Sequence, residues 1–185
     1  SVAKSHPTSS TDTAFFLYTS GSGGTPKAAV HQHKDMLVCA LSYAQGVLGI
    51  QPFDRTFSVS KLFFAYGLGN GMYFPFSVGA ATVLNPERPR PEKIAELLAR
   101  HRPSVFFSVP TIYNLLLREA ERGLAIDFSS VRLAVSAGEA LPAEIFEQFR
   151  ARFGLKIVDG IGSTEMLQMF ISNRPGEARP GTCGR

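Results

Sequence analysis

The run SVFFSVP at residues 104–110 decides the fold, because it lies between two helical patterns. Over residues 94–101, the positions i, i+3, i+4 and i+7 are occupied by Ile94, Leu97, Leu98 and His101, which is the spacing of one helix face. Pro103 ends that pattern, and Pro110 opens a second helix with the same spacing. A short run of valine and phenylalanine between two amphipathic helices predicts a buried strand.

The same alternation extends in both directions along the chain. After residue 110 the sequence predicts a strand and turn over 131–138, a helix from Pro142 that Gly154 caps, and a strand over 155–160. Toward the N-terminus it predicts strands at 14–19, 28–33, 55–60 and 80–84, and a helix at 34–50. Strands that alternate with helices predict an α/β fold with a mostly parallel sheet and helices on both faces.

Composition indicates a globular protein and excludes several classes. The 185 residues suffice for one domain, with 44% apolar and 18% charged residues. The net charge of +4 comes without a block of like charges, and no apolar run is long enough to span a bilayer, so we expect neither nucleic acid nor membrane as partner.

Cys39 and Cys183 form no CxxC motif, which favours a reduced, cytoplasmic setting without a zinc site or disulfide framework. Residues 1–12 are polar and linker-like, and we expect the chain to be part of a longer protein.

Three loops follow predicted strands: residues 20–27, 136–142 and 159–165. In open α/β sheets, ligands bind beyond the carboxyl ends of the strands. We therefore expect the three loops to lie at one edge of the sheet and to share a cleft.

The first loop, SGSGGTPK, combines glycines and hydroxyls with Lys27. Backbone N–H groups, hydroxyl donors and an ammonium group suit a polyphosphate. It is not a Walker A loop, because Pro26 precedes the lysine, Ala28 follows it, and a strand comes next. A flexible hairpin connection is the alternative.

The other two loops carry weaker signals. In SAGEALP (136–142), small residues let a flat ring approach the backbone, although an ordinary turn with Glu139 in solvent explains the same letters. In DGIGSTE (159–165), Glu165 beside the hydroxyls of Ser163 and Thr164 suits Mg²⁺, although a helix N-cap with a first-turn acid is the alternative.

Other candidate residues favour structural interpretations. His31 and His33 are predicted to share one strand face, but no third ligand has metal spacing, so a structural role is favoured. Cys39 is expected to be buried on its helix, and Ser136 does not belong to a GxSxG elbow.

Taken together, YTSGSGGTPKA (18–28), SAGEALP and DGIGSTE resemble the phosphate loop, adenine-side turn and threonine-glutamate motif of the adenylate-forming superfamily. That superfamily contains acyl-CoA synthetases, luciferases and peptide-synthetase adenylation domains. FFAYGLGNGMYFPF (63–76) and GIGSTEMLQMFISNRPG (160–176) are most similar to the benzoate-CoA ligase group. The resemblance implies that residues 13–185 form the ATP- and acyl-binding segment of the large N-terminal domain, without the C-terminal domain.

The resemblance also assigns roles to residues. The implied phosphate-binding residues are Thr19, Ser20, Gly21, Ser22, Gly24, Thr25 and Lys27. The implied adenine-binding residues are Gly138, Glu139, Ala140, Asp159, Gly160 and Ile161. The implied acyl pocket consists of Ala65, Tyr66, Gly67, Gly162, Gln168 and Met169. The implied catalytic residues are Lys27, Thr164 and Glu165, of which Glu165 binds Mg²⁺.

The implied activity is ATP-dependent conversion of benzoate, or a substituted benzoate, to acyl-AMP and pyrophosphate. In the full-length enzyme, coenzyme A then reacts with the acyl-AMP to form a thioester. A homodimer is one possible assembly of the full-length enzyme. The chain alone is expected to have little or no activity. A noncatalytic acyl-adenylate-binding module, a ligase for another carboxylic acid and a kinase that transfers the γ-phosphate are the alternatives.

Three positions depart from the pattern of the family. Gly23 replaces the usual Ser or Thr, and Ala28 replaces a glycine. Gln168 and Met169 replace the His-Ile of the benzoate group, so the preferred acid is expected to differ from plain benzoate in its ring substituent.

Overall fold

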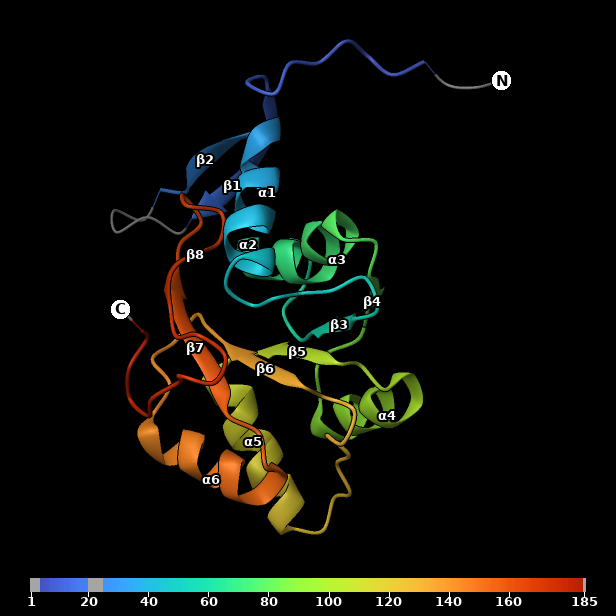
Figure 1. Cartoon of the computed structure of the whole chain (residues 1–185), viewed down its shortest axis with the longest axis vertical. Helices are drawn as coiled ribbons and strands as arrows, with labels where there is room; N and C mark the ends of the chain where they lie inside the picture. Colours follow the sequence, from blue (N-terminus) through green and yellow to red (C-terminus); the bar gives the residue numbers. More distant parts are fainter. Residues whose placement is uncertain (1–3, 20–24, 185) are drawn as a thin grey trace.

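The computed structural model describes residues 4–19 and 25–184. It contains a two-stranded and a six-stranded sheet (Figure 1). Strands β1 (Thr13–Thr19) and β2 (Lys27–Gln32) form an antiparallel hairpin that is a sheet of its own. The main sheet has the order β4-β3-β5-β6-β7-β8, with bounds β3 Arg55–Ser58, β4 Ala81–Val83, β5 Val105–Ser108, β6 Leu133–Ser136, β7 Ile157–Gly162 and β8 Met169–Ser172.

Helices cover both faces of the main sheet (Figure 1). One face carries α4 (Pro91–His101), α5 (Pro110–Glu121) and α6 (Ala143–Phe153). The other carries α1 (His33–Cys39), α2 (Ala65–Leu68) and α3 (Phe74–Ser77), together with the π-helices η1 (Ala40–Gln45) and η2 (Gly69–Tyr73). Successive strand residues point to opposite faces, so Phe106 joins the core under α4–α6 while Phe107 joins the core under η1.

These layers confirm the predicted α/β class with a mostly parallel sheet. Strands β4, β3, β5, β6 and β7 pair in parallel, and the edge strand β8 pairs with β7 antiparallel. The edge strand β8 was not predicted. The helix expected over 34–50 ends earlier, since its last helical residue is Gln45 in η1.

The hairpin that carries the ends of the first loop is separate from the main sheet. Strands β1 and β2 pair only with each other, so the strands that flank the first loop belong to a different sheet from the strands that precede the other two loops. The hairpin packs on α1 through β2 (Figure 1).

An ion pair between a buried carboxylate and a partly exposed arginine lies at the opposite, amino end of the sheet. Arg132, just before β6, contacts both carboxylate oxygens of Asp54, just before β3, at 2.9 and 2.5 Å. The hydroxyl of Ser104, just before β5, donates to the same carboxylate at 2.7 Å. The Asp54 carboxylate therefore links the starts of β3, β5 and β6. These contacts lie at the end of the sheet opposite the carboxyl ends of the strands.

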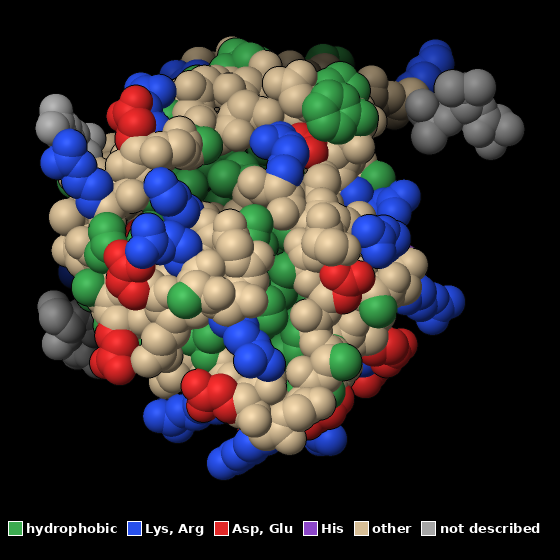
Figure 2. Space-filling model, turned by 60° about the horizontal axis from the view of Figure 1, so that its bottom comes forward, with side chains coloured by type: hydrophobic (Ala, Val, Ile, Leu, Met, Phe, Trp, Pro, Cys, Tyr) green, Lys and Arg blue, Asp and Glu red, His purple; other side chains and the backbone are tan. Residues whose placement is uncertain are grey.

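Charge is dispersed over the face that Figure 2 shows, where Lys and Arg side chains alternate with Asp and Glu. Within residues 4–19 and 25–184, no helix combines the length and apolar character needed to cross a bilayer.

Candidate functional site

A cavity of about 390 Å³ opens where β5, β6 and β7 end, and we call it the β6–β7 cavity. Val109 follows β5, Ala137 and Gly138 follow β6, and Gly162 ends β7, so three strand ends supply part of its wall. The aromatic segment before α2 and the turn after β7 supply the rest. Its lining residues are Ser60, Phe64, Ala65, Tyr66, Val109, Ala137, Gly138, Gly162, Ser163, Thr164, Leu167, Gln168 and Met169.

This cavity brings together residues of the implied acyl pocket, one implied adenine-binding residue and one implied catalytic residue. Five of the six residues of the implied acyl pocket line it, beside Gly138 and Thr164. These five are Ala65, Tyr66, Gly162, Gln168 and Met169. A ring bound among them would lie next to the turn that carries Thr164.

Tyr66 and Gln168 form the polar part of the wall. The Tyr66 hydroxyl donates to the carbonyl oxygens of Ser108 and Val135 at 3.2 and 3.3 Å, and burial raises its pKa well above the ordinary tyrosine value. The Gln168 side chain is buried, and its amide nitrogen lies 3.5 Å from the Tyr66 carbonyl oxygen. Tyr66 therefore stays neutral and acts as a fixed hydroxyl, not as a base.

Gly67 of the implied acyl pocket does not line the cavity. It is buried beneath the wall, where an added Cβ would lie 2.0 Å from the carbonyl oxygen of Lys61. Because Gly67 has no side chain, α2 can pack closely against the preceding backbone.

The turn that carries Thr164 has an unusual conformation. The Leu167 N–H donates to the Thr164 carbonyl at 3.1 Å, and Leu167 itself has φ +64°. The Leu167 side chain is buried, so packing compensates for a backbone conformation that only glycine adopts readily. The backbone N–H of Met166 donates to the Ser163 hydroxyl at 3.1 Å.

Glu165 faces a different cavity from Thr164. It lines a cavity of about 550 Å³ between η1, α1 and β8, which we call the α1–β8 cavity, together with His31, Cys39, Tyr43 and Arg174. Leu167 and Met169 line both cavities and form the wall between them. The expected single cleft is thus two adjoining cavities in this structure.

The implied adenine-side residues divide into two groups. Gly138, with φ +87°, lies in the β6–β7 cavity, and Ala140 is exposed on the same turn. The Glu139 carboxylate accepts hydrogen bonds from the backbone N–H and the hydroxyl of Thr111, at 3.3 and 2.6 Å. It therefore caps the first turn of α5, which corrects the alternative of a merely solvated acid.

Asp159, Gly160 and Ile161 are residues of β7, which continues two residues beyond the strand predicted over 155–160. Gly160 is required by the close approach of β8, since an added Cβ would lie 2.9 Å from the Ile171 carbonyl oxygen. The Asp159 side chain is buried, and its pKa is raised by burial, an effect partly offset by the Cys183 thiol, which donates to its carboxylate at 3.6 Å. Its roles next to a nucleotide remain a prediction.

Of the implied phosphate loop, the structure describes the two ends. Thr19 and Lys27 face each other as the last pair of the hairpin, and Thr25 and Lys27 are exposed. The predictions for Ser20, Gly21, Ser22 and Gly24, and the departure at Gly23, lie outside the described residues.

Two expectations about histidine and cysteine need correction. His33 is the first residue of α1 and is exposed, so it does not share a strand face with His31, which is 2% exposed. Cys39 is only half-buried, because it lines the α1–β8 cavity, and burial raises the pKa of its thiol.

His31 is a site residue that sequence patterns did not reveal. Its Nε2 atom lies 2.9 Å from the carbonyl oxygen of Thr164, a residue 133 positions away. The Cys39 thiol donates to the Met166 carbonyl of the same turn at 3.8 Å. No local signal could have shown these contacts, because each joins the hairpin or α1 to a distant turn.

The side chains at the site fit Mg²⁺ only when a nucleotide shares the coordination. Among residues 4–19 and 25–184, no group of three or more His, Cys, Asp or Glu side chains could hold a metal ion. Mg²⁺ commonly takes one or two carboxylates with substrate phosphates and water, and Glu165 is an exposed carboxylate.

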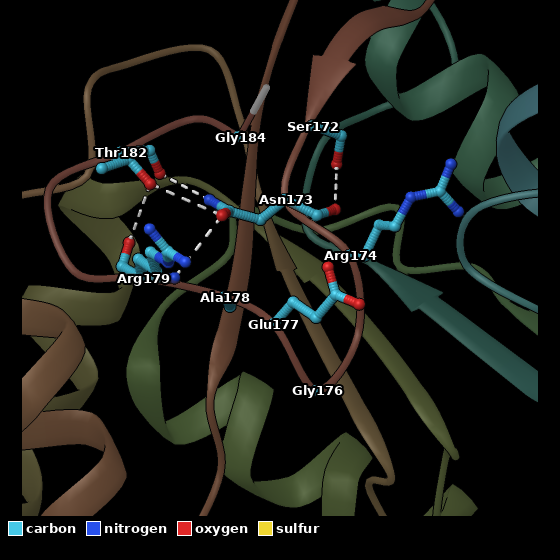
Figure 3. A pocket seen from close by; sticks show the side chains of 9 residues that line it. All are labelled: Ser172, Asn173, Arg174, Gly176, Glu177, Ala178, Arg179, Thr182 and Gly184. Atoms are coloured by element: carbon cyan, nitrogen blue, oxygen red, sulfur yellow. Dashed lines mark hydrogen bonds between the residues drawn. The ribbon is translucent and has the colours of Figure 1, made fainter.

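A third cavity, of about 620 Å³, lies in the segment after β8. Figure 3 shows the Asn173 side chain pointing to Thr182 and Arg179, and its amide nitrogen contacts the Thr182 carbonyl oxygen at 2.5 Å. The Asn173 amide oxygen accepts from the backbone N–H of Arg179 at 3.4 Å. Asn173 thus organises this segment, and none of the predicted site residues lies there.

An open α/β sheet with a cavity at its strand ends and a threonine-glutamate turn beside it defines a ligand-binding domain of the nucleotide-binding type. The model of the AMP-binding enzyme family matches residues 1–185, and the chain belongs to that family.

Relatives within the family act on aromatic acids. Over 97% of its own length, the chain is 49% identical to the benzoate–CoA ligase of Thauera aromatica. Over 92% of its own length, it is 45% identical to the anthranilate–CoA ligase of Pseudomonas aeruginosa. A crystal structure of a benzoate CoA ligase from Burkholderia xenovorans matches with a TM-score of 0.88 and 47% identity over 99% of the chain and 36% of that structure. An anthranilate CoA ligase in complex with anthranoyl-AMP matches with a TM-score of 0.89 and 41% identity, over 95% of this chain and 34% of that one.

The chain spans about a third of the length of the curated relatives it matches, namely 34% and 32% of the two above. The fold is thus that of part of the N-terminal domain of adenylate-forming enzymes, as the sequence predicted.

Proposed function

We propose that the full-length protein containing this chain activates an aromatic carboxylate with ATP and then forms its CoA thioester. The observation that carries the proposal is the β6–β7 cavity, where residues of the implied acyl pocket adjoin Gly138 and Thr164. Membership of the AMP-binding family and similarity to benzoate, anthranilate and hydroxybenzoate ligases support the same reaction.

In the first step, a carboxylate oxygen of the acid attacks the α-phosphorus of ATP. The bond from that phosphorus to the bridging oxygen of the β-phosphate breaks, and pyrophosphate leaves with the electron pair. The carboxylate is already ionised, so no general base is needed, and catalysis consists of positioning and charge neutralisation. The Tyr66 hydroxyl agrees with this, since its proton is donated to main-chain carbonyls and the side chain serves as wall and not as base.

The proposed roles follow from position along the cavity. The wall formed by Ala65, Tyr66 and Gly162 would hold the ring, and the backbone at Gly138 would accept the adenine. Thr164 would donate to the α-phosphate, while Lys27 and the hairpin loop would bind the β- and γ-phosphates. When bound to Glu165 and phosphate oxygens, Mg²⁺ would neutralise charge that develops on the phosphates.

The cavity also supports a substituted ring. Gln168 places an amide, and Met169 a flexible thioether, at the wall of the cavity. An amide can bond a ring hydroxyl or amino group that an apolar wall would reject. We propose a hydroxy- or aminobenzoate as the preferred acid, with plain benzoate and acids of other classes as alternatives.

Product analysis of the purified full-length protein tests the reaction. With ATP, Mg²⁺, CoA and a panel of benzoates, we expect AMP, pyrophosphate and an aroyl-CoA in equal amounts. ADP as product would instead indicate γ-phosphate transfer by a kinase.

The second candidate is a noncatalytic module that only binds acyl-adenylates. A nonhydrolysable acyl-AMP mimic would bind in either case, so binding alone does not separate the two. Tight binding of the mimic without any aroyl-CoA formation would favour the module.

A further inference from the structure

We propose that His31 is a positioning residue that holds the Thr164 turn in register with the strand that begins at Lys27. The inference rests on the proposed function, because it names what sets the geometry of that site. Its core is one contact: His31 on β2 meets the Thr164 carbonyl across 2.9 Å.

The direction of this hydrogen bond is fixed by chemistry. A carbonyl oxygen can only accept, so Nε2 of His31 carries the proton and donates it to Thr164. The ring is 2% exposed, so loss of the bond would leave a buried polar group without its partner, which is costly.

The orientation of the ring is set from two elements. The ring of Phe15 on β1 packs against it with centroids 5.3 Å apart. The other ring nitrogen, Nδ1, lies 3.7 Å from the carboxylate of Asp35 on α1. That carboxylate also accepts from the Gln32 backbone N–H at 2.8 Å, so it is itself held in place.

The turn that receives this bond needs outside support. Its Leu167 has φ +64°, a conformation that costs about 1–2 kcal/mol for a residue with a side chain. The Thr164 carbonyl accepts both the Leu167 N–H, at 3.1 Å, and His31. His31 therefore adds to the internal bond of the turn a tie to the neighbouring sheet.

This tie connects two parts of the proposed site that share no sheet. Lys27 begins β2 and His31 lies near its end, whereas Thr164 follows β7 of the main sheet. In a reaction that depends on positioning, a displacement of about 1 Å between phosphate contacts costs on the order of a hundredfold in rate.

The test compares two variants of the full-length protein in steady-state kinetics of acid-dependent AMP formation. His31→Phe keeps a ring against Phe15 but has no donor, and His31→Gln keeps a donor of similar reach. We expect His31→Phe to lower kcat on the order of ten- to a hundredfold with the KM of the acid changed by less than about threefold. His31→Gln should recover a substantial part of kcat.

Ser130→Ala is the matched control. The Ser130 hydroxyl donates to the Pro103 carbonyl, also at 2.9 Å, at the amino end of the sheet away from the cavities. It should lower the thermal midpoint about as much as His31→Phe does and leave kcat unchanged. Equal kcat losses in both variants, or wild-type kcat in His31→Phe, would overturn the proposal.

A readout that needs no activity separates this inference from the proposed function. Hydrogen exchange of the Leu167 amide should speed up at least tenfold in His31→Phe and return toward wild type in His31→Gln. Wild-type protein that forms no AMP would defeat the proposed function, whereas unchanged Leu167 exchange would defeat the role of His31.

Discussion

The buried carboxylate of Asp54 makes the stability of the folded protein depend on pH. Burial would raise its pKa, but hydrogen bonds from Arg132, Ser104 and the Gln51 backbone outweigh that effect, and the pKa lies below its ordinary value. A lowered pKa means that the folded state favours the ionised form. The stabilisation is therefore present above the ordinary aspartate pKa of about 3.9 and is lost as pH falls through the lower folded value.

Asp54→Asn should destabilise the protein mainly at neutral pH. The neutral amide leaves Arg132 without its counter-charge, and we expect a loss of about 3 kcal/mol, the low end for a broken buried pair, because the Arg132 side chain is 39% exposed. Thermal unfolding at pH 7 and near pH 3 measures this, and the gap between wild type and variant should shrink at the lower pH. A gap that widens on acidification would refute the ion-pair explanation.

Gly67→Ala should disturb the cavity wall without touching the cavity. Its Cβ would meet two backbone oxygens, of Lys61 at 2.0 Å and Ser60 at 2.5 Å, which cannot move as a side chain can. We expect a loss of about 1–3 kcal/mol of stability, the usual cost of overpacking, and a higher KM for the acid. Gly71→Ala is the control, since its Cβ would meet only the ends of two flexible side chains, of Leu62 at 3.0 Å and Leu84 at 3.6 Å. Equal effects of the two changes would contradict this argument.

At the scale of elements, the sequence predicted those whose pattern is local. Helices α4, α5 and α6 and strands β5, β6 and β7 follow from apolar spacing and from Pro103, Pro110 and Gly154. Strand β8 was missed because its exposed residues, Phe170 and Ile171, look like part of the preceding motif. The sequence did not predict that the β1–β2 hairpin is separate from the main sheet, because the local sequence of a strand does not show which strands it pairs with.

The same limit applies to the candidate site. Motif order predicted that Tyr66, Gly162 and Gln168 meet, and the β6–β7 cavity brings them together. It did not predict that Glu165 faces the α1–β8 cavity, nor that Leu167, two residues later, has a left-handed backbone. Side-chain direction after such a turn depends on packing across the sheet, and no spacing rule reports it.

The end of α6 provides a prediction about one element. Gly154 has φ +72° and donates its N–H to the Arg150 carbonyl, and a Cβ there would meet nothing within 4 Å. Gly154→Ala therefore changes backbone strain alone, and should cost about 1 kcal/mol in urea unfolding. Gly154→Asn should cost less, because asparagine tolerates this conformation. A larger loss for asparagine than for alanine would show that contacts, not strain, decide this position.

At the scale of the whole molecule, apolar side chains gather on the outside of the hairpin and of α1. Phe16, Tyr18 and Val30 of the hairpin and Leu37 and Val38 of α1 are each more than half exposed, from 54% to 72%. Exposed apolar clusters of this kind are unusual on a soluble surface that meets only water. Both elements hold parts of the proposed site, Lys27 and His31 on the hairpin and Cys39 on α1, so their packing bears on activity.

This arrangement leads to the expectation that the 185-residue chain alone is a poor catalyst. Its relatives are about three times as long, and the hairpin that carries Lys27 has an apolar face without cover among the described residues. Benzoate-dependent exchange of pyrophosphate into ATP measures the first step alone. We expect exchange by the full-length protein and at least a hundredfold less by the chain, because imprecise positioning of phosphate contacts costs about that much. Exchange by the chain within tenfold of the full-length rate would mean that the two cavities and the hairpin suffice for acid activation.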